Sequence, residues 1–309
     1  MLKRLLLLFS FLFVFVLPVA LFAQESDSTD TWDNWDNEDD YECSDTPNFD
    51  FMDFHMHGKP TIEATYGNSK LGIKSFTRGF SNVGAAELKL SYSRLSEYEG
   101  YIVKYRNNFA YISNSTTDLI SKTGAVNDIS SNLWRFGFGS QEGYGYKFGN
   151  SAIIPYTSNS FGWSRVEWNL PGAATTGPLL YTPDEMNTLS LYDKTFRFGT
   201  MSEGGIKLQI VPLLTFNAGY ERSIVFPRHL FWKHLGSMAV EWIGIGAVDF
   251  FSREVMDSSP AAGPIINFLL KNGLSYAIYQ LRREKMNWPF DSAEPLSYDT
   301  WKVGMTFTF

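Results

Sequence analysis

This sequence holds little cysteine and none of the short motifs that mark common cofactor sites. A single cysteine, Cys43, forms no internal disulfide, which excludes a small domain held together by disulfide bonds. No phosphate-binding loop, dinucleotide fingerprint or cysteine-based metal site appears. We therefore expect no cofactor, no metal site and no nucleic-acid partner.

The first residues have the organisation of an export signal. Lys3 and Arg4 precede an almost wholly apolar stretch over residues 5–20, and Ala23 closes it before a polar segment begins. A positive start, a short apolar core and a small final residue predict a secretory signal peptide over residues 1–23. A retained transmembrane anchor is the alternative, which the shortness of the apolar stretch disfavours.

Positive charge is missing from the next stretch. Residues 24–53 contain twelve carboxylates and no Lys or Arg, so this stretch repels itself and buries little. Without the signal and this stretch, 21 acids and 24 bases remain, so the acidity belongs to the tail. We predict a disordered acidic segment over residues 24–56, followed by one folded domain over residues 57–309.

From residue 57 onward, short segments alternate apolar and polar side chains. The clearest case ends the chain, where one face of a strand carries Trp301, Val303, Met305, Phe307 and Phe309. This segment resembles the C-terminal targeting strand of bacterial outer-membrane barrels, with alternating apolar residues and a terminal Phe. The resemblance implies export to the outer membrane and delivery by the barrel-assembly machinery, and names no particular family.

Aromatic residues make up 17% of the chain and gather on the apolar faces of these strands, whereas the core of a soluble β-sandwich is mostly aliphatic. The opposite faces carry Gly, Ser, Thr and charges, which favours a wall between lipid and a wet interior. We predict an antiparallel transmembrane β-barrel of about 8–12 strands, an all-β membrane protein with a helical insert. The soluble β-sandwich is the alternative.

The insert covers residues 227–286, where the apolar period changes to that of a helix. Its longest uncharged run, Ser258–Leu270, has thirteen residues. A membrane span needs about twenty apolar residues, so these segments are too charged to span. We predict an amphipathic helical hairpin on the barrel, with Ser259 capping its second helix and Pro260 at the first position. The hairpin plugs the lumen, closes the periplasmic mouth or lies in the membrane interface.

Two groups of residues offer weak candidates for chemistry. His234, Ser237 and Glu241 share one helical face, but any amphipathic helix presents such triples, and a polar stripe is the simpler interpretation. His55 and His57 near Asp53 resemble a metal site only loosely. We therefore predict no catalytic residue and do not expect an enzyme.

The charged residues on the polar strand faces give the remaining candidate site. If these faces line the lumen, basic residues outnumber acidic ones, and the lumen attracts anions. The lumen candidates are Lys89, Lys104, Arg106, Arg135, Lys147, Arg197, Lys207, Glu87 and Glu221.

A basic lumen suits passage or binding of a small anionic or amphiphilic solute. Docking of residues 24–53 in this lumen is one hypothesis. A solvated spacer, or a handle for a periplasmic or envelope protein, is the other. A structural or assembly protein with a plugged barrel is the second functional candidate, and a lipid-modifying enzyme is the third. Membrane lipid is a partner in each case.

Overall fold

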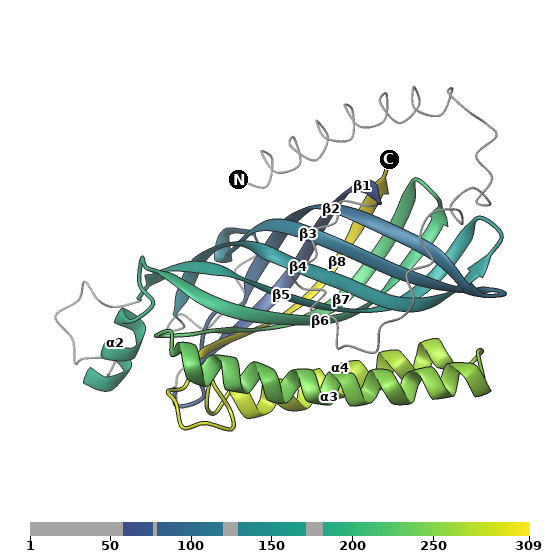
Figure 1. Cartoon of the computed structure of the whole chain (residues 1–309). Helices are drawn as coiled ribbons and strands as arrows, with labels where there is room; N and C mark the ends of the chain where they lie inside the picture. Colours follow the sequence, from purple (N-terminus) through teal and green to yellow (C-terminus); the bar gives the residue numbers. More distant parts are fainter. Residues whose placement is uncertain (1–57, 77–78, 120–128, 171–181) are drawn as a thin grey trace.

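The structure is a computed structural model that describes residues 58–76, 79–119, 129–170 and 182–309 (Figure 1). The described residues form eight antiparallel strands that close into a barrel, which confirms the predicted architecture at the lower end of its range. The strands are β1 (Lys59–Gly72), β2 (Val83–Glu99), β3 (Ile102–Thr116), β4 (Ser130–Phe148), β5 (Ser151–Asn169), β6 (Phe196–Val211), β7 (Leu214–Val225) and β8 (Leu296–Thr308).

Pairing of the first strand with the last one closes the sheet. The register between β1 and β8 runs from Thr61 opposite Thr308 to Gly72 opposite Ser297. Closure removes free strand edges, whose unpaired backbone groups lipid cannot satisfy. The strands have 12 to 19 residues, whereas about 9–11 residues cross a bilayer, so their ends extend beyond the hydrocarbon region.

The two ends of the barrel differ. At the turn end, β2–β3, β4–β5 and β6–β7 join through tight turns, two of which use glycines with positive φ, Gly100 and Gly149. At the loop end, the connections are long. The short helices η3 (Thr117–Leu119) and α2 (Pro183–Ser190) lie there; α2, which the sequence analysis did not predict, begins with a capping box between Thr182 and Glu185.

The lumen is filled by side chains in three layers. Apolar clusters lie at both ends, around Leu133 and Tyr192 at the loop end and around Tyr105 and Ile154 at the turn end. Between them lies a network of charged residues that are at most 8% exposed. An eight-stranded barrel is narrow enough for side chains to fill, and this one is filled in that way.

The outer wall of the barrel is apolar and aromatic. Its exposed side chains alternate along the strands with the buried residues of the lumen. They include Tyr66, Leu90, Ile112, Trp134, Phe136, Phe138, Ile206, Phe216, Trp301 and Val303. Such a belt is the surface that an outer-membrane barrel presents to lipid.

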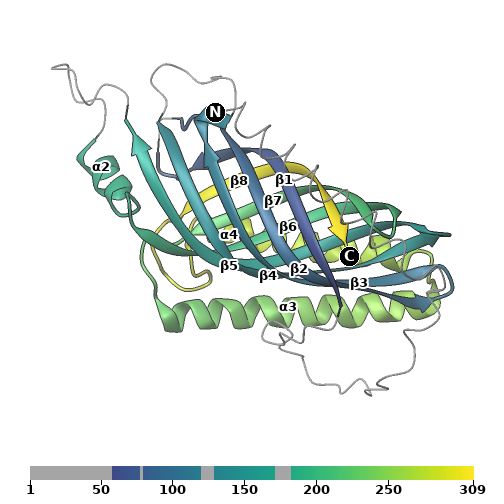
Figure 2. The ribbon, with the colours of Figure 1, turned by 90° about the horizontal axis from the view of Figure 1, so that it is seen from above.

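The insert forms two antiparallel helices, α3 (Phe231–Ser258) and α4 (Gly263–Arg282). They lie alongside the barrel and follow its long axis, and Figures 1 and 2 show both helices outside the strands. The hairpin therefore neither plugs the lumen nor closes an end of it. The predicted cap is also wrong, because Ala262 precedes α4 and Ser259 ends α3.

The hydrophobicity of α3 also differs from our expectation. By length and composition it qualifies as a helix that can cross a membrane, and only 11% of its most apolar stretch is buried. The sequence analysis considered only uninterrupted apolar runs and so did not predict this property of α3. The charged residues of α3 are spaced so that the mean hydropathy over a long stretch of the helix stays high.

We predict that the charged layer of the lumen depends on Lys302. Its ammonium lies 2.8 Å from Glu87, 2.8 Å from Glu203 and 2.6 Å from Glu221. Lys302→Met leaves buried carboxylates without this partner, so the free energy of unfolding should fall by about 3–5 kcal/mol. Urea titration in lipid vesicles measures it. Lys70→Met, which changes an exposed outward lysine, serves as control and should stay within about 0.5 kcal/mol.

Candidate binding cleft between the helical hairpin and the barrel wall

The helical hairpin is polar inside and apolar outside. On α4, Asn267, Lys271, Ser275 and Arg282 are buried, whereas Leu269 is 60% exposed. On α3, the buried residues are His234, Ser237, Ser252 and Met256, and Trp232 and Ile243 are 79% and 75% exposed. A helix in water buries its apolar stripe, so this reversed arrangement is typical of helices surrounded by lipid.

The polar face of α4 meets a polar strip on the outer wall. Lys271 lies 2.5 Å from Glu142 of β4 and 2.6 Å from Asp249 of α3. The hydroxyl of Tyr279 donates to Asp299 of β8 at 2.7 Å. These contacts pair charged and hydrogen-bonding groups where lipid supplies no partner, so they fix the hairpin against the barrel.

Asn272 forms the centre of this contact. Its amide nitrogen donates to the hydroxyl of Thr157 on β5 at 2.9 Å, and Arg222 of β7 donates to its backbone carbonyl at 3.3 Å. Gly204 of β6 makes the approach possible, because a Cβ at that position would lie 2.1 Å from the Asn272 side-chain oxygen. We call the contacts of Glu142, Thr157, Gly204, Arg222 and Asp299 with α4 the polar seam.

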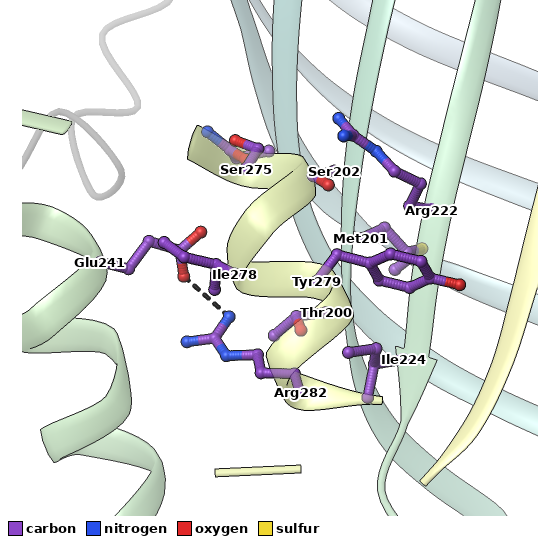
Figure 3. A pocket seen from close by; sticks show the side chains of 11 residues that line it. Thr200, Met201, Ser202, Arg222, Ile224, Glu241, Ser275, Ile278, Tyr279 and Arg282 are labelled. Carbon is purple, nitrogen blue, oxygen red and sulfur yellow. Dashed lines mark ion pairs between the residues drawn. The ribbon is translucent and has the colours of Figure 1, made fainter. Parts of the chain in front are cut away.

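A second cluster joins the two helices near the loop end. Arg282 of α4 pairs with Glu241 of α3 at 2.7 Å and donates to the hydroxyl of Ser237 at 2.9 Å. Figure 3 shows the Arg282–Glu241 pair beside a small cavity of about 40 Å³, with Tyr279 and Arg222 on its barrel side. The cavity is large enough to hold a water molecule.

This cluster explains the His234, Ser237 and Glu241 triple. Ser237 and Glu241 both interact with Arg282, and the ring of His234 packs edge-on against Phe198 at 5.5 Å. The three residues share a buried face, but the structure shows no His–Ser hydrogen bond, so the arrangement is that of a helix–helix contact. His55, His57 and Asp53 lie outside the described residues.

A large cleft of about 710 Å³ opens between α3 and the outer wall at β5 and β6. On the helix, its lining residues follow the spacing of one face, namely Phe231, His234, Leu235, Met238, Glu241, Trp242 and Ile245. On the barrel, Phe161, Trp163, Phe196 and Phe198 form its wall. The cleft is therefore long, mostly apolar and strongly aromatic.

Five of the nine lumen candidates lie in the charged layer of the lumen. They are Lys89, Arg135, Lys207, Glu87 and Glu221. Sequence reasoning missed three further members of this layer, Glu63, Glu203 and Lys302, which pair with the others. With these included, the layer has four bases and four acids, so the expected excess of positive charge is absent from this layer.

The other four candidates lie outside the charged layer, two on the outer wall and two on inward strand faces at the ends of the barrel. Lys104 and Arg106 alternate with the buried Tyr105 and lie on the outer face of β3, because the assumed register was off by one residue. Lys147 lies on the inward face of β4, opposite the buried Ala152, and pairs with Glu97 at the turn end. Arg197 lies on the inward face of β6 at the loop end, because it alternates with the outward Phe196 and Phe198 and lies opposite the buried Ser164.

The predicted targeting residues lie in or just after β8. Trp301 and Val303 are 68% and 62% exposed on the outer wall, and Met305 and Phe307 continue the same face. The backbone of Phe309 donates to the carbonyl of Pro60, which ties the end of the chain to β1.

No protein-family model and no curated protein matches this sequence. Several solved barrels resemble its fold. Neisserial surface protein A is 9% identical, with a TM-score of 0.36 and coverage of 81% of this chain and 97% of that chain. Ail, the attachment invasion locus protein of Yersinia pestis, is 9% identical, with a TM-score of 0.33 and coverage of 82% and 99%.

The outer membrane protein OprG of Pseudomonas aeruginosa is 10% identical, with a TM-score of 0.28 and coverage of 82% and 96%. Because these values are low, we assign the class from the barrel itself. A closed sheet with an apolar, aromatic outer wall and a charged interior is an outer-membrane β-barrel.

We predict that Gly204→Ala loosens the hairpin. The added methyl group displaces the Asn272 side chain and breaks its hydrogen bonds, so docking should weaken by about 1–3 kcal/mol. Spin labels on α4 and β5 report it as a broader distance distribution. Gly246→Ala is the matched control, because the space beside Gly246 on α3 is open. An unchanged distribution in Gly204→Ala would show that the seam does not hold the hairpin.

Proposed function

We propose that this protein is inserted in the outer membrane of a bacterium, and that it binds an amphiphile in the cleft between α3 and the barrel. The observation that carries the proposal is the contrast between a sealed lumen and an open outer cleft of about 710 Å³. The working surface is then the outer wall of the barrel, and its ligand comes from the membrane.

The lumen offers little support for passage of a solute. Arg135 is 2% exposed and donates to Glu221 at 2.5 Å and to Tyr298 at 3.0 Å. Lys207 is also 2% exposed and donates to Glu63 at 2.6 Å. A solute that enters this layer has to separate buried ion pairs and displace the apolar clusters at both ends, which costs many kcal/mol.

The shape of the cleft suits a hydrocarbon chain. Its lining on α3 runs from Phe231 to Ile245, a rise of roughly 21 Å along the helix. Aromatic and aliphatic side chains line most of that length. They provide an apolar surface against which a hydrocarbon chain of a ligand can pack. Polar groups also line the cleft, among them Arg228 and His229 at the loop end and Asn159 and Glu241 further along, so the headgroup of an amphiphile has partners beside the apolar surface.

A sealed barrel also favours a second candidate, a structural or assembly role in the envelope. Under this candidate, the barrel is an anchor, and the acidic segment 24–53 holds a periplasmic or envelope protein. In both cases we propose that the C-terminal strand engages the barrel-assembly machinery. Amphiphile binding separates the two candidates, because an anchor has no need of the cleft.

The test combines conductance with binding. In planar bilayers, the purified chain should show no stable conductance, with or without residues 24–53. By native mass spectrometry, it should retain long-chain amphiphiles from detergent. Met238→Trp fills the cleft and should weaken retention about tenfold, the loss expected when about 1.4 kcal/mol of chain burial is removed.

Ile243→Trp is the matched control, because Ile243 is exposed on α3 away from the cleft. Equal retention by both variants would remove the cleft as the binding site. A stable conductance would contradict a sealed lumen and would favour passage of a solute through it.

A further inference from the structure

Beyond the cleft, the geometry points to a second site on the outer wall, where Arg94, Lys104 and Arg106 hold the headgroup of an anionic phospholipid at the turn end of the barrel. The site lies on β2 and β3, next to the polar seam, and does not depend on a ligand in the cleft. Such a site needs basic side chains that face lipid and lie at the depth of headgroups, and the strand register gives both.

The three basic residues lie on the outward faces of their strands. On β2, Arg94 follows the exposed, outward Tyr92 at the strand period of two. On β3, Lys104 and Arg106 flank Tyr105, which is buried in the lumen. Arg94 and Arg106 are exposed and lie directly opposite each other across the β2–β3 pair. All three side chains therefore face away from the lumen, on the side of the wall that meets lipid.

Positive charge prevails on this part of the wall. Along the regular part of β2, β3 and β4, the outward face carries these three bases and one acid, Glu142, which pairs with Lys271 of α4 at 2.5 Å. Among the described residues, no carboxylate lies at ion-pair distance from Arg94. Like charges directly opposite each other destabilise a pair of strands, so an anion that bridges Arg94 and Arg106 would stabilise the sheet.

The rows of paired residues place the arginines at the edge of the apolar belt. On the loop side, two outward rows across β2, β3 and β4 are apolar, and they consist of Leu88, Ile112 and Phe136, and of Leu90, Ala110 and Phe138. On the turn side lie the tyrosines Tyr98, Tyr101, Tyr144 and Tyr146. Tyrosines gather at the membrane–water interface, and the turn end of outer-membrane barrels faces the periplasm. The arginine row therefore lies at headgroup depth in the periplasmic leaflet.

The chemistry of these groups selects a negatively charged phosphodiester. A planar guanidinium donates paired hydrogen bonds to phosphate oxygens, and two guanidiniums side by side offer two such pairs. Lys104 adds a third positive charge, with its ammonium 5.7 Å from the centre of the Tyr144 ring. A zwitterionic headgroup fits less well, because its own cation meets a positive wall. The acyl chains then lie over the apolar rows that begin at Leu90, on the loop side of the arginines.

The experiment compares three lipids with the same two acyl chains and different headgroups. Phosphatidylglycerol, phosphatidylcholine and uncharged diacylglycerol are titrated against the purified full chain in detergent by native mass spectrometry, and inorganic phosphate is a fourth arm. We expect phosphatidylglycerol to bind about tenfold more tightly than either other lipid, as charge-assisted hydrogen bonds predict. The preference should be the same in Met238→Trp, because that substitution fills the cleft and leaves the turn end unchanged.

Arg94→Gln combined with Arg106→Gln should remove this preference and leave the affinity for diacylglycerol unchanged. Arg165→Gln is the matched control, because Arg165 lies on the outward face of β5 near the loop end, where it pairs with Glu167 at 3.0 Å. Arg94→Glu is a second variant, and it should also remove the preference. It places a carboxylate opposite Arg106, so the sheet keeps its stability and the loss of binding is not a loss of folding. Circular dichroism checks the fold of each variant.

Four outcomes would overturn the site. Equal binding of phosphatidylglycerol and diacylglycerol would show that the basic residues hold no headgroup. Loss of the preference in Met238→Trp would place the headgroup in the cleft instead. Competition by inorganic phosphate as strong as that of the lipid would indicate a site for a free anion. A preference that appears only after removal of residues 24–53 would show that the acidic segment of the chain itself is the occupant.

Discussion

Lipid offers no hydrogen-bond partner, and this constraint organises both parts of the structure. A charged group at membrane depth is stabilised by partners within the protein, so charges collect in the lumen and along the polar seam. Lys302 contacts three glutamates inside the barrel, and Lys271 contacts Glu142 and Asp249 outside it. Many of the apolar and aromatic side chains cover the outside of both the strands and the helices.

The same constraint favours a binding site on the outer wall of the barrel rather than in its lumen. A barrel of eight strands has room for its own side chains, and here opposite charges fill the middle layer in equal number. Once the lumen is closed, the outer wall is the surface that remains for binding. The hairpin converts part of this wall into a cleft, because α4 is fixed by the seam while α3 lies further out and leaves space against β5 and β6.

The hairpin and the cleft depend on each other. Arg282 and Glu241 join the two helices beside the cleft, and His234 and Phe198 bring α3 against the barrel at its loop end. Changes in the seam should therefore alter the cleft even when they lie outside its lining. Gly204 illustrates this link, since its missing side chain lets Asn272 reach the wall. Ligand binding in the cleft and docking of the hairpin on the barrel then depend on the same helix–barrel contacts.

The sequence by itself determined the class of the fold. Period-two alternation in the last nine residues, and in segments such as 86–93, depends only on the local backbone, so strands and their two faces were predictable. The change to a helical period at residues 227–286 was equally local. Charged residues on strand faces were also predictable, and five of them lie in the charged layer of the lumen.

Only the tertiary structure decided which charges meet and where the hairpin lies. Lys104 and Arg106 lie on the outer face of β3, one residue out of register from the prediction. Lys302 contacts three glutamates that lie on other strands. The hairpin presents its polar face to the barrel because a matching polar strip, spread over β4, β5, β7 and β8, exists on the outer wall. Such matches join residues far apart in sequence, so they arise only when the barrel closes.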